Sequence, residues 1–241
     1  MKKIQLILLS ALFTTVSAQN LQVHYDLGKG RNYVTSTFEM FKTDNLGNTF
    51  AFVDIDFNTD KYKHPSSAYL EITRCFTLAK SPISAHIEYN GGLFFNNPQS
   101  TSSFLTGYPI NNAYLVGLDY GWHDKNFSKF LTFQVLYKYI AGKNPTSFQL
   151  TGVWDLGFFN KKVSFSGFAD FWREDNTNFY KPNGEELTTP TLTKFVFMSE
   201  PQIWYNFTPH ISLGSEVELG VNFGAVHGLK FCPTLGAKYI F

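Results

Sequence analysis

A two-residue alternation of apolar and polar side chains recurs along this chain and constrains its fold more than any other feature. In residues 49–58 the odd positions are Thr, Ala, Val, Ile and Phe, whereas the even positions are Phe, Phe, Asp, Asp and Asn. Residues 131–139, 163–172 and 211–223 alternate in a similar way. A period of two is typical of a β-strand with one apolar face. No comparable segment repeats at the spacing of an amphipathic helix, so the sequence predicts an all-β chain.

The alternation divides the chain into about twelve segments, most of which are longer than the ~5–6 residues of an average soluble strand. Such lengths match the ~9–11 residues with which a tilted strand crosses a bilayer. The predicted strands run over residues 20–27, 31–42, 48–58, 67–79, 82–95, 110–122, 129–140, 146–157, 162–173, 193–206, 210–223 and 229–241.

Composition excludes several other classes of protein. The 241 residues are 44% hydrophobic, 18% aromatic and 16% charged, which is too aromatic and too weakly charged for a disordered chain. Lys and Arg total 20 against 19 Asp and Glu, so an extended basic surface for nucleic acid is not expected. Beyond the N-terminus no stretch approaches the ~20 consecutive apolar residues of a transmembrane helix.

The N-terminus has the pattern of an export signal. Lys2 and Lys3 precede a mostly apolar run over residues 4–13, and small residues lead up to Ala18. We expect a cleaved signal peptide over residues 1–18 and a single mature domain over residues 19–241. No Cys stands at the cut, which argues against a lipoprotein.

The connections between predicted strands indicate a membrane barrel. If the first strand starts in the periplasm, the connections near 43–47, 80–81, 123–128, 158–161 and 207–209 are periplasmic, and all are short. The longest connections, near 59–66, 96–109 and 174–192, are then external. Short periplasmic turns and longer external loops are typical of outer-membrane barrels. A sheet survives in lipid only when it is closed. We therefore predict a closed antiparallel transmembrane β-barrel of about twelve strands in the outer membrane of a Gram-negative-type cell.

The last strand ends the chain at Phe241. A terminal Phe on an alternating strand resembles the signal that the outer-membrane barrel-assembly machinery reads. We expect this machinery and the outer-membrane lipids to be partners of the chain.

The predicted inner face carries aromatic and charged side chains. A flat, hydroxyl-rich neutral solute would suit such a wall, because aromatics stack on its face and carboxylates accept its hydrogen bonds. Alternatively, the aromatics fill space and the acids form a structural network. Arg74 falls on the lipid side, where an Arg at mid-membrane would cost ~2–4 kcal/mol, so it lies near an interface or a bulge turns it inwards. The inner set comprises Phe50, Phe52, Tyr69, Phe168, Trp172, Glu39, Asp54, Asp56, Glu71, His86, Glu88, Asp119, Asp155, Asp170, Glu216 and Glu218, opposed by Lys138 and Lys238.

Other chemistry has weaker support in the sequence. Cys75 and Cys232 are too few for a disulfide scaffold, and we expect two free, buried thiols. The histidines form no recognisable triad, HExxH or His-x-His pattern, although His86 and Glu88 could share an inward face. We expect no enzyme activity, cofactor or metal. The 174–192 connection could act as an adhesin-like binding loop or fold inwards as a plug.

Several short motifs resemble the nucleoside-specific channel-forming (Tsx/OmpK) family. One runs from Tyr-Asp-Leu-Gly-Lys-Gly-Arg-Asn-Tyr at 25–33, through Phe-Glu-Met-Phe at 38–41, to Phe-Val-Asp at 52–54. Tyr-Leu-Glu-Ile-Thr-Arg-Cys-Phe at 69–76 and Gly-Phe-Ala-Asp-Phe at 167–171 look like two further strands of that family. The resemblance implies a monomeric twelve-stranded barrel that passes nucleosides. It also implies that the lumen wall includes Tyr33, Glu39, Phe52, Asp54, Glu71, Arg74 and Asp170.

Overall fold

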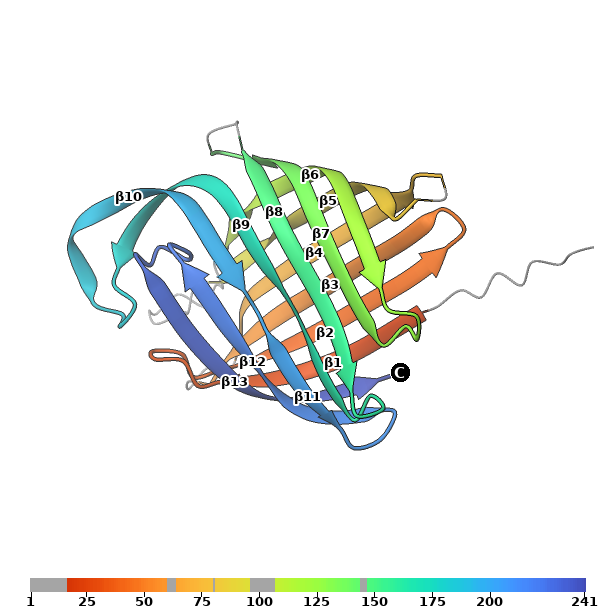
Figure 1. The fold of residues 1–241 in the computed structure, drawn as a ribbon. Helices are drawn as coiled ribbons and strands as arrows, with labels where there is room; N and C mark the ends of the chain where they lie inside the picture. Colours follow the sequence, from red (N-terminus) through yellow and green to blue (C-terminus); the bar gives the residue numbers. More distant parts are fainter. Residues whose placement is uncertain (1–16, 60–63, 80, 96–106, 144–146) are drawn as a thin grey trace, which may run out of the picture.

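The chain forms one antiparallel sheet rolled into a barrel (Figure 1). The structure, a computed structural model, describes residues 17–59, 64–79, 81–95, 107–143 and 147–241, and within these ranges no helix is long and apolar enough to cross a membrane. The strands are β1 (Ser17–Asp26), β2 (Tyr33–Asp44), β3 (Gly47–Asn58), β4 (Pro65–Thr77), β5 (Ile83–Phe95), β6 (Gly107–His123), β7 (Lys129–Ile140), β8 (Phe148–Phe158), β9 (Val163–Tyr180), β10 (Glu186–Ser199), β11 (Gln202–Asn206), β12 (Ile211–Val221) and β13 (Leu229–Ile240).

The barrel closes through its first and last strands. Neighbours from β1 to β9 pair in chain order, and β13 pairs with both β12 and β1. Both β10 and β11 pair with β9 on one side and β12 on the other, so they occupy one position in the wall. The wall therefore has twelve strand positions, which confirms the predicted closed, twelve-stranded antiparallel barrel.

The predicted strand over 193–206 is split between Ser199 and Gln202. Pro201 lies in the gap and has no backbone N–H for a ladder hydrogen bond. Opposite the gap, Gly167 has a φ of 144°, and a Cβ at this position would lie 2.4 Å from the Glu200 carbonyl oxygen. Glycine therefore lets β9 approach the irregular backbone closely.

The predicted long connection over 174–192 is wrong, because most of it is strand. β9 continues to Tyr180 and β10 begins at Glu186, so this hairpin extends the wall (Figure 1). Its tip joins the connection between β12 and β13, where the Phe179 N–H donates to the Ala225 carbonyl at 2.8 Å. These backbone hydrogen bonds hold the segment along the wall rather than in the lumen as a plug.

The short turns lie at one end of the barrel, as predicted. The short connections at residues 45–46, 78–79 with 81–82, 124–128, 159–162 and 207–210 lie at the end of the barrel where the C-terminus lies (Figure 1). In one such turn Asp124 accepts hydrogen bonds from the Ser128 side chain and backbone, both at 2.7 Å. The Ser128 side-chain hydrogen bond holds the pKa of Asp124 below its usual value. Much of the predicted 59–66 and 96–109 connections, and residues 1–16 of the predicted signal peptide, fall outside the described residues.

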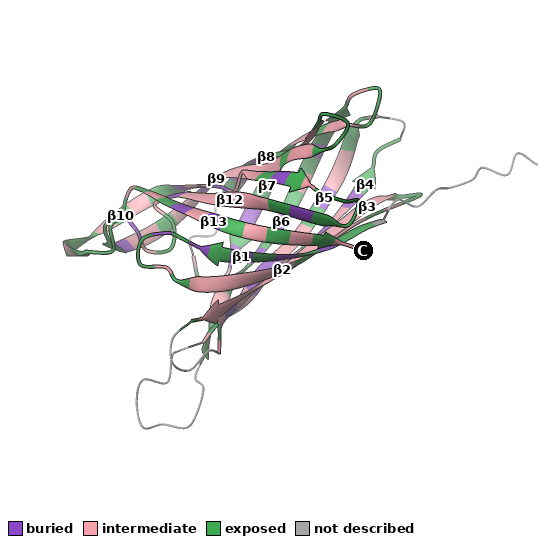
Figure 2. Ribbon diagram, turned by 90° about the horizontal axis from the view of Figure 1, so that it is seen from below, coloured by how far each residue is buried: buried purple, intermediate pink, exposed green. Residues whose placement is uncertain are grey.

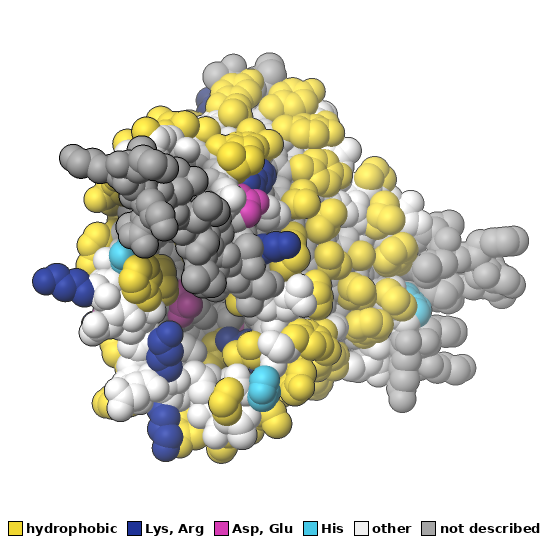
Figure 3. Space-filling view, turned by 90° about the vertical axis from the view of Figure 1, so that its right-hand side faces the viewer, with side chains coloured by type: hydrophobic (Ala, Val, Ile, Leu, Met, Phe, Trp, Pro, Cys, Tyr) yellow, Lys and Arg dark blue, Asp and Glu magenta, His cyan; other side chains and the backbone are white. Residues whose placement is uncertain are grey.

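Burial alternates along the wall strands (Figure 2). On β6, Tyr114 is 51% exposed whereas its neighbour Leu115 is 3% exposed. The same parity continues through Val116 and Leu118, which point outwards, and Asp119, which points inwards. Hydrophobic side chains spread over the outside, and Asp and Glu are visible at few places in Figure 3. Each strand thus contributes one apolar outer face and one inner face, as its sequence predicts.

Candidate functional site in the barrel interior

An aromatic row lines the interior along β3 and β4. The rings of Phe50 and Phe52 are 6.0 Å apart, and the ring of Tyr69 is 6.0 Å from that of Phe52. Phe52 stands opposite Glu39 on β2 and Glu71 on β4 in the strand register. The row therefore lies between two inward-facing carboxylates.

Hydroxyl groups orient the carboxylates beside this aromatic row. Thr37 Oγ1 donates to Asp54 at 2.6 Å, and the Tyr69 hydroxyl donates to Glu71 at 2.8 Å. Glu39 accepts a hydrogen bond from the Asn20 amide at 3.1 Å. Each of these three hydrogen bonds engages one oxygen of a carboxylate, and a carboxylate can accept several. The carboxylates therefore retain capacity to accept hydrogen bonds from a solute.

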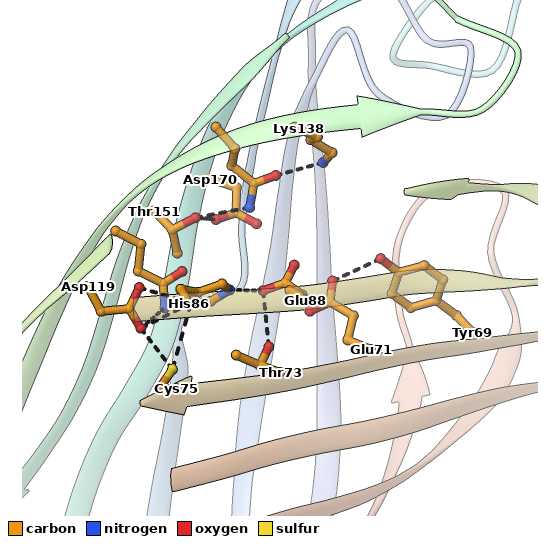
Figure 4. Close-up of polar contacts among 12 residues, drawn as sticks. Tyr69, Glu71, Thr73, Cys75, His86, Glu88, Asp119, Lys138, Thr151 and Asp170 are labelled. Carbon is orange, nitrogen blue, oxygen red and sulfur yellow. Dashed lines mark hydrogen bonds and ion pairs between the residues drawn. The ribbon is translucent and has the colours of Figure 1, made fainter. Parts of the chain in front are cut away.

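A second group of side chains surrounds Lys138 on β7. Lys138 Nζ donates to Gln149 Oε1 at 2.6 Å and lies 4.3 Å from the centre of the Trp172 ring. Thr151 Oγ1 donates to Asp170 at 2.5 Å beside them (Figure 4). The adjoining inner face is apolar and buried, and its members are Ala113, Leu115, Leu136, Ile140 and Val196.

A third group surrounds Trp204 on β11, which is 0% exposed. Its Nε1 donates to Gln202 Oε1 at 2.9 Å, and Lys238 Nζ lies 4.3 Å from the ring centre. Gly214 and Gly236 are paired beside it, and a Cβ on either would come within 2.6 or 3.1 Å of an indole atom. The two glycines thus make room for a large aromatic side chain inside the barrel.

A cysteine, a histidine and two carboxylates form a fourth group on β4, β5 and β6. His86 is central: its Nδ1 lies 3.0 Å from Asp119 Oδ2, and its Nε2 lies 2.9 Å from Glu88 Oε2 (Figure 4). Cys75 Sγ lies 3.1 Å from Asp119 Oδ2 and 3.8 Å from His86 Nδ1. Thr73 Oγ1 donates to Glu88 at 3.0 Å.

The structure distributes the predicted wall residues over the interior. Phe52, Asp54 and Glu71 lie together on β3 and β4, with Glu39 on the adjacent strand β2. Tyr33 stands apart at the start of β2, where the Arg31 guanidinium lies 5.2 Å from its ring centre. Asp170 lies beside Thr151 in the Lys138 group.

The placement of Arg74 in the lumen wall is wrong. Arg74 Nη2 pairs with Asp44 at 2.8 Å, next to the β2–β3 turn, and Nη1 donates to Thr49 at 3.1 Å. Its neighbours Thr73 and Cys75 are buried on the inner face, so strand parity puts Arg74 outside. It is accommodated there because it lies at the end of the strand, beside a carboxylate.

The two cysteines of the chain and one tryptophan complete the comparison of predicted and observed inner residues. Cys75 and Cys232 are both free and buried, as expected. Sequence reasoning did not single out Trp204 or a contact of Cys75 with His86 and Asp119. Parity marks Cys75 as inward, since it lies two residues from Thr73 and four from Glu71, but parity on one strand does not show which inward residues of other strands it meets.

The described strands form a closed antiparallel β-barrel of twelve strand positions, and its fold is similar to that of solved barrels. The NanC porin superposes with a TM-score of 0.54 at 12% identity, covering 92% of this chain and 99% of that chain. The KdgM porin has a TM-score of 0.49 at 11% identity, covering 94% and 99%. The COG4313 outer membrane channel from Pseudomonas putida F1 has a TM-score of 0.44 at 9% identity, covering 99% and 100%.

Residues 18–241 match the family described as "Domain of unknown function (DUF5020)", and the chain belongs to that family. No curated protein matches the sequence.

Proposed function

We propose that this protein is a narrow, passive outer-membrane channel for small uncharged polar solutes, and that nucleosides are the solute class that fits it best. The observation that carries the proposal is the row of Phe50, Phe52 and Tyr69, with Asp54 and Glu71 beside it. A nucleoside has a flat base that stacks on aromatic rings and ribose hydroxyls that donate to carboxylates.

The charge of the interior supports an uncharged solute. The inner carboxylates include Asp54, Glu71 and Asp170, and few cations oppose them. Lys138 and Lys238, the cations of the Lys138 and Trp204 groups, each lie over a tryptophan ring. A ring of acidic side chains disfavours anions in a pore. Nucleotides and sugar acids should therefore pass less readily than nucleosides of similar size.

Permeation through liposomes tests the solute class. The purified protein should admit nucleosides faster than pentoses or disaccharides, and sugar acids more slowly than neutral sugars. Equal permeation of every solute would contradict the nucleoside assignment. If no solute enters the liposomes, the channel function is refuted. The better hypothesis is then a barrel that acts as an adhesin through its external loops, or as an enzyme.

Single substitutions test the aromatic row. An aromatic stacking contact contributes about 0.5–1.5 kcal/mol, so Phe52→Ala should lower the preference for nucleosides over pentoses by about 2- to 10-fold. Val53→Ala on the same strand changes the outer face and is the matched control. Normal preference in Phe52→Ala and Asp54→Asn would exclude these residues from the solute path.

We further propose that the barrel acts as a monomer and that Phe241 is read during assembly. Phe241 follows β13, its N–H donates to the Gln19 carbonyl at 3.0 Å, and the residue is 63% exposed. Its ring therefore stays accessible while its backbone is held at the barrel seam.

A further inference from the structure

Three side chains with different ligand atoms converge inside the barrel on neighbouring strands. Cys75 on β4 is paired with His86 on β5, and Asp119 on β6 is paired with Ser84, two residues before His86 on β5. Cys75 Sγ, His86 Nδ1 and a carboxylate oxygen of Asp119 all lie within 4.8 Å of one another. Three strands of a continuous sheet hold them, so the site is built on rigid backbone.

This group is buried, and one of its oxygens lacks a hydrogen bond. His86 is 0% exposed, and Cys75 and Asp119 are buried beside it. Asp119 Oδ1 makes no hydrogen bond within the described residues, and its 2.9 Å contact with His86 Nδ1 is an ion pair only when that nitrogen carries a proton. A buried carboxylate oxygen without a hydrogen bond calls for an explanation, and a bound cation is one.

Glu88 orients the histidine as in a metal site. His86 Nε2 lies 2.9 Å from Glu88 Oε2, and Thr73 Oγ1 donates to the same oxygen at 3.0 Å. With the proton on Nε2 and donated to Glu88, the lone pair of Nδ1 faces Cys75 and Asp119. Metal-binding histidines commonly donate their other ring N–H to a carboxylate in this way.

We propose that Cys75, His86 and Asp119 bind a divalent transition metal of the zinc class. Thiolate and imidazole ligands favour Zn²⁺ over Mg²⁺ or Ca²⁺, which take oxygen ligands. Tetrahedral Zn²⁺ with bonds of about 2.0–2.3 Å separates its ligand atoms by about 3.3–3.8 Å. The 3.8 Å between Cys75 Sγ and His86 Nδ1 lies at the upper end of this range and closes slightly on binding, and the Asp119 oxygens move back by a few tenths of an ångström.

Binding displaces a proton from the thiol. Cys75 Sγ–H donates to Asp119 Oδ2 in the metal-free arrangement. When the sulfur–metal bond forms, this proton leaves for solvent, as does any proton on His86 Nδ1, and no electron is transferred. Metal affinity should therefore rise with pH. The site is independent of the solute that the channel passes.

Cobalt is the probe for the site in the refolded mature chain. We expect one Co²⁺ per chain, a thiolate-to-cobalt charge-transfer band in the near ultraviolet, and loss of that band on addition of Zn²⁺. Cys75→Ser should remove the band. Cys232→Ser, which alters the other buried thiol, should retain it. Glu88→Gln should weaken binding by about 10- to 100-fold, as loss of an orienting carboxylate typically does.

Alkylation of wild-type protein supplies a second readout if Cys75→Ser does not fold. Zn²⁺ should slow alkylation of Cys75, located by mass spectrometry, and leave the rate at Cys232 unchanged. Absence of the cobalt band in wild type, or its persistence in folded Cys75→Ser, would overturn the proposal. An alkylation rate at Cys75 that does not change when Zn²⁺ is added would also overturn it. His86 would then serve only as a hydrogen-bonded link between Asp119 and Glu88.

Discussion

Replacing Trp204 by alanine tests whether the interior is packed tightly enough to constrict the channel. A buried Trp→Ala substitution costs about 3–5 kcal/mol of unfolding free energy. That range includes the hydrogen bond to Gln202, about 0.5–1.5 kcal/mol, and the cation–π contact with Lys238, up to about 2 kcal/mol. Because both partners are polar, water can enter the vacated space. We therefore expect a loss near the lower end, about 3 kcal/mol.

The assay is reversible urea unfolding of the refolded barrel in detergent micelles, followed by far-ultraviolet circular dichroism. Val153→Ala is a control on the inner face of β8, where the side chain is more exposed, and it should cost less than about 1 kcal/mol. Single-channel conductance should rise in Trp204→Ala, because the substitution removes an indole from the interior.

A double-mutant cycle with Gly236 isolates the packing contact. A methyl group on Gly236 would lie 2.8 Å from His24 Nδ1 and 3.1 Å from Trp204 Cη2, so Gly236→Ala should cost about 1–3 kcal/mol. The cost should fall in the Trp204→Ala background, with a coupling energy of at least about 0.5 kcal/mol. Additive effects, together with a loss below about 1 kcal/mol for Trp204→Ala, would refute the packed-interior reasoning.

Three further predictions concern the ends of the barrel. Arg74→Gln should leave solute permeation unchanged and lower the free energy of unfolding by at most about 1 kcal/mol, because the pair with Asp44 is partly exposed. Altered solute selectivity would show that Arg74 belongs to the lumen wall. Phe241→Ala should lower the yield of barrel in the outer membrane while refolding in detergent stays normal, and undiminished yield in cells would count against an assembly signal. Because the folded pKa of Asp124 is lowered, its contribution to stability is present above the unfolded value and lost as pH falls through the folded value. The stability difference between wild type and Asp124→Asn should therefore shrink in urea titrations below about pH 4, and a difference that is constant with pH would contradict this.

The local pattern was sufficient to predict most of the wall. Alternation depends only on the direction of successive side chains along a strand, so it assigned Phe52, Asp54 and Glu71 to the inner face before any pairing was known. The short turns were equally predictable, because the residues of each turn are contiguous in sequence. The conformation of residues 174–192 could not be predicted from the local pattern. In this segment β9 and β10 extend because they pair with each other and contact residues near Ala225.

The sequence by itself determined that this chain is a closed, two-faced barrel, because period-two alternation without long apolar runs leaves few other ways to place its apolar side chains. Only the tertiary structure decided which inner residues meet. Cys75, His86 and Asp119 converge because of the register between β4, β5 and β6, and Trp204 lies against Gly214 and Gly236 for the same kind of reason. Register is set by hydrogen bonds between strands that are distant in sequence and by the closure of the barrel. Neither can be inferred from the sequence of a single strand.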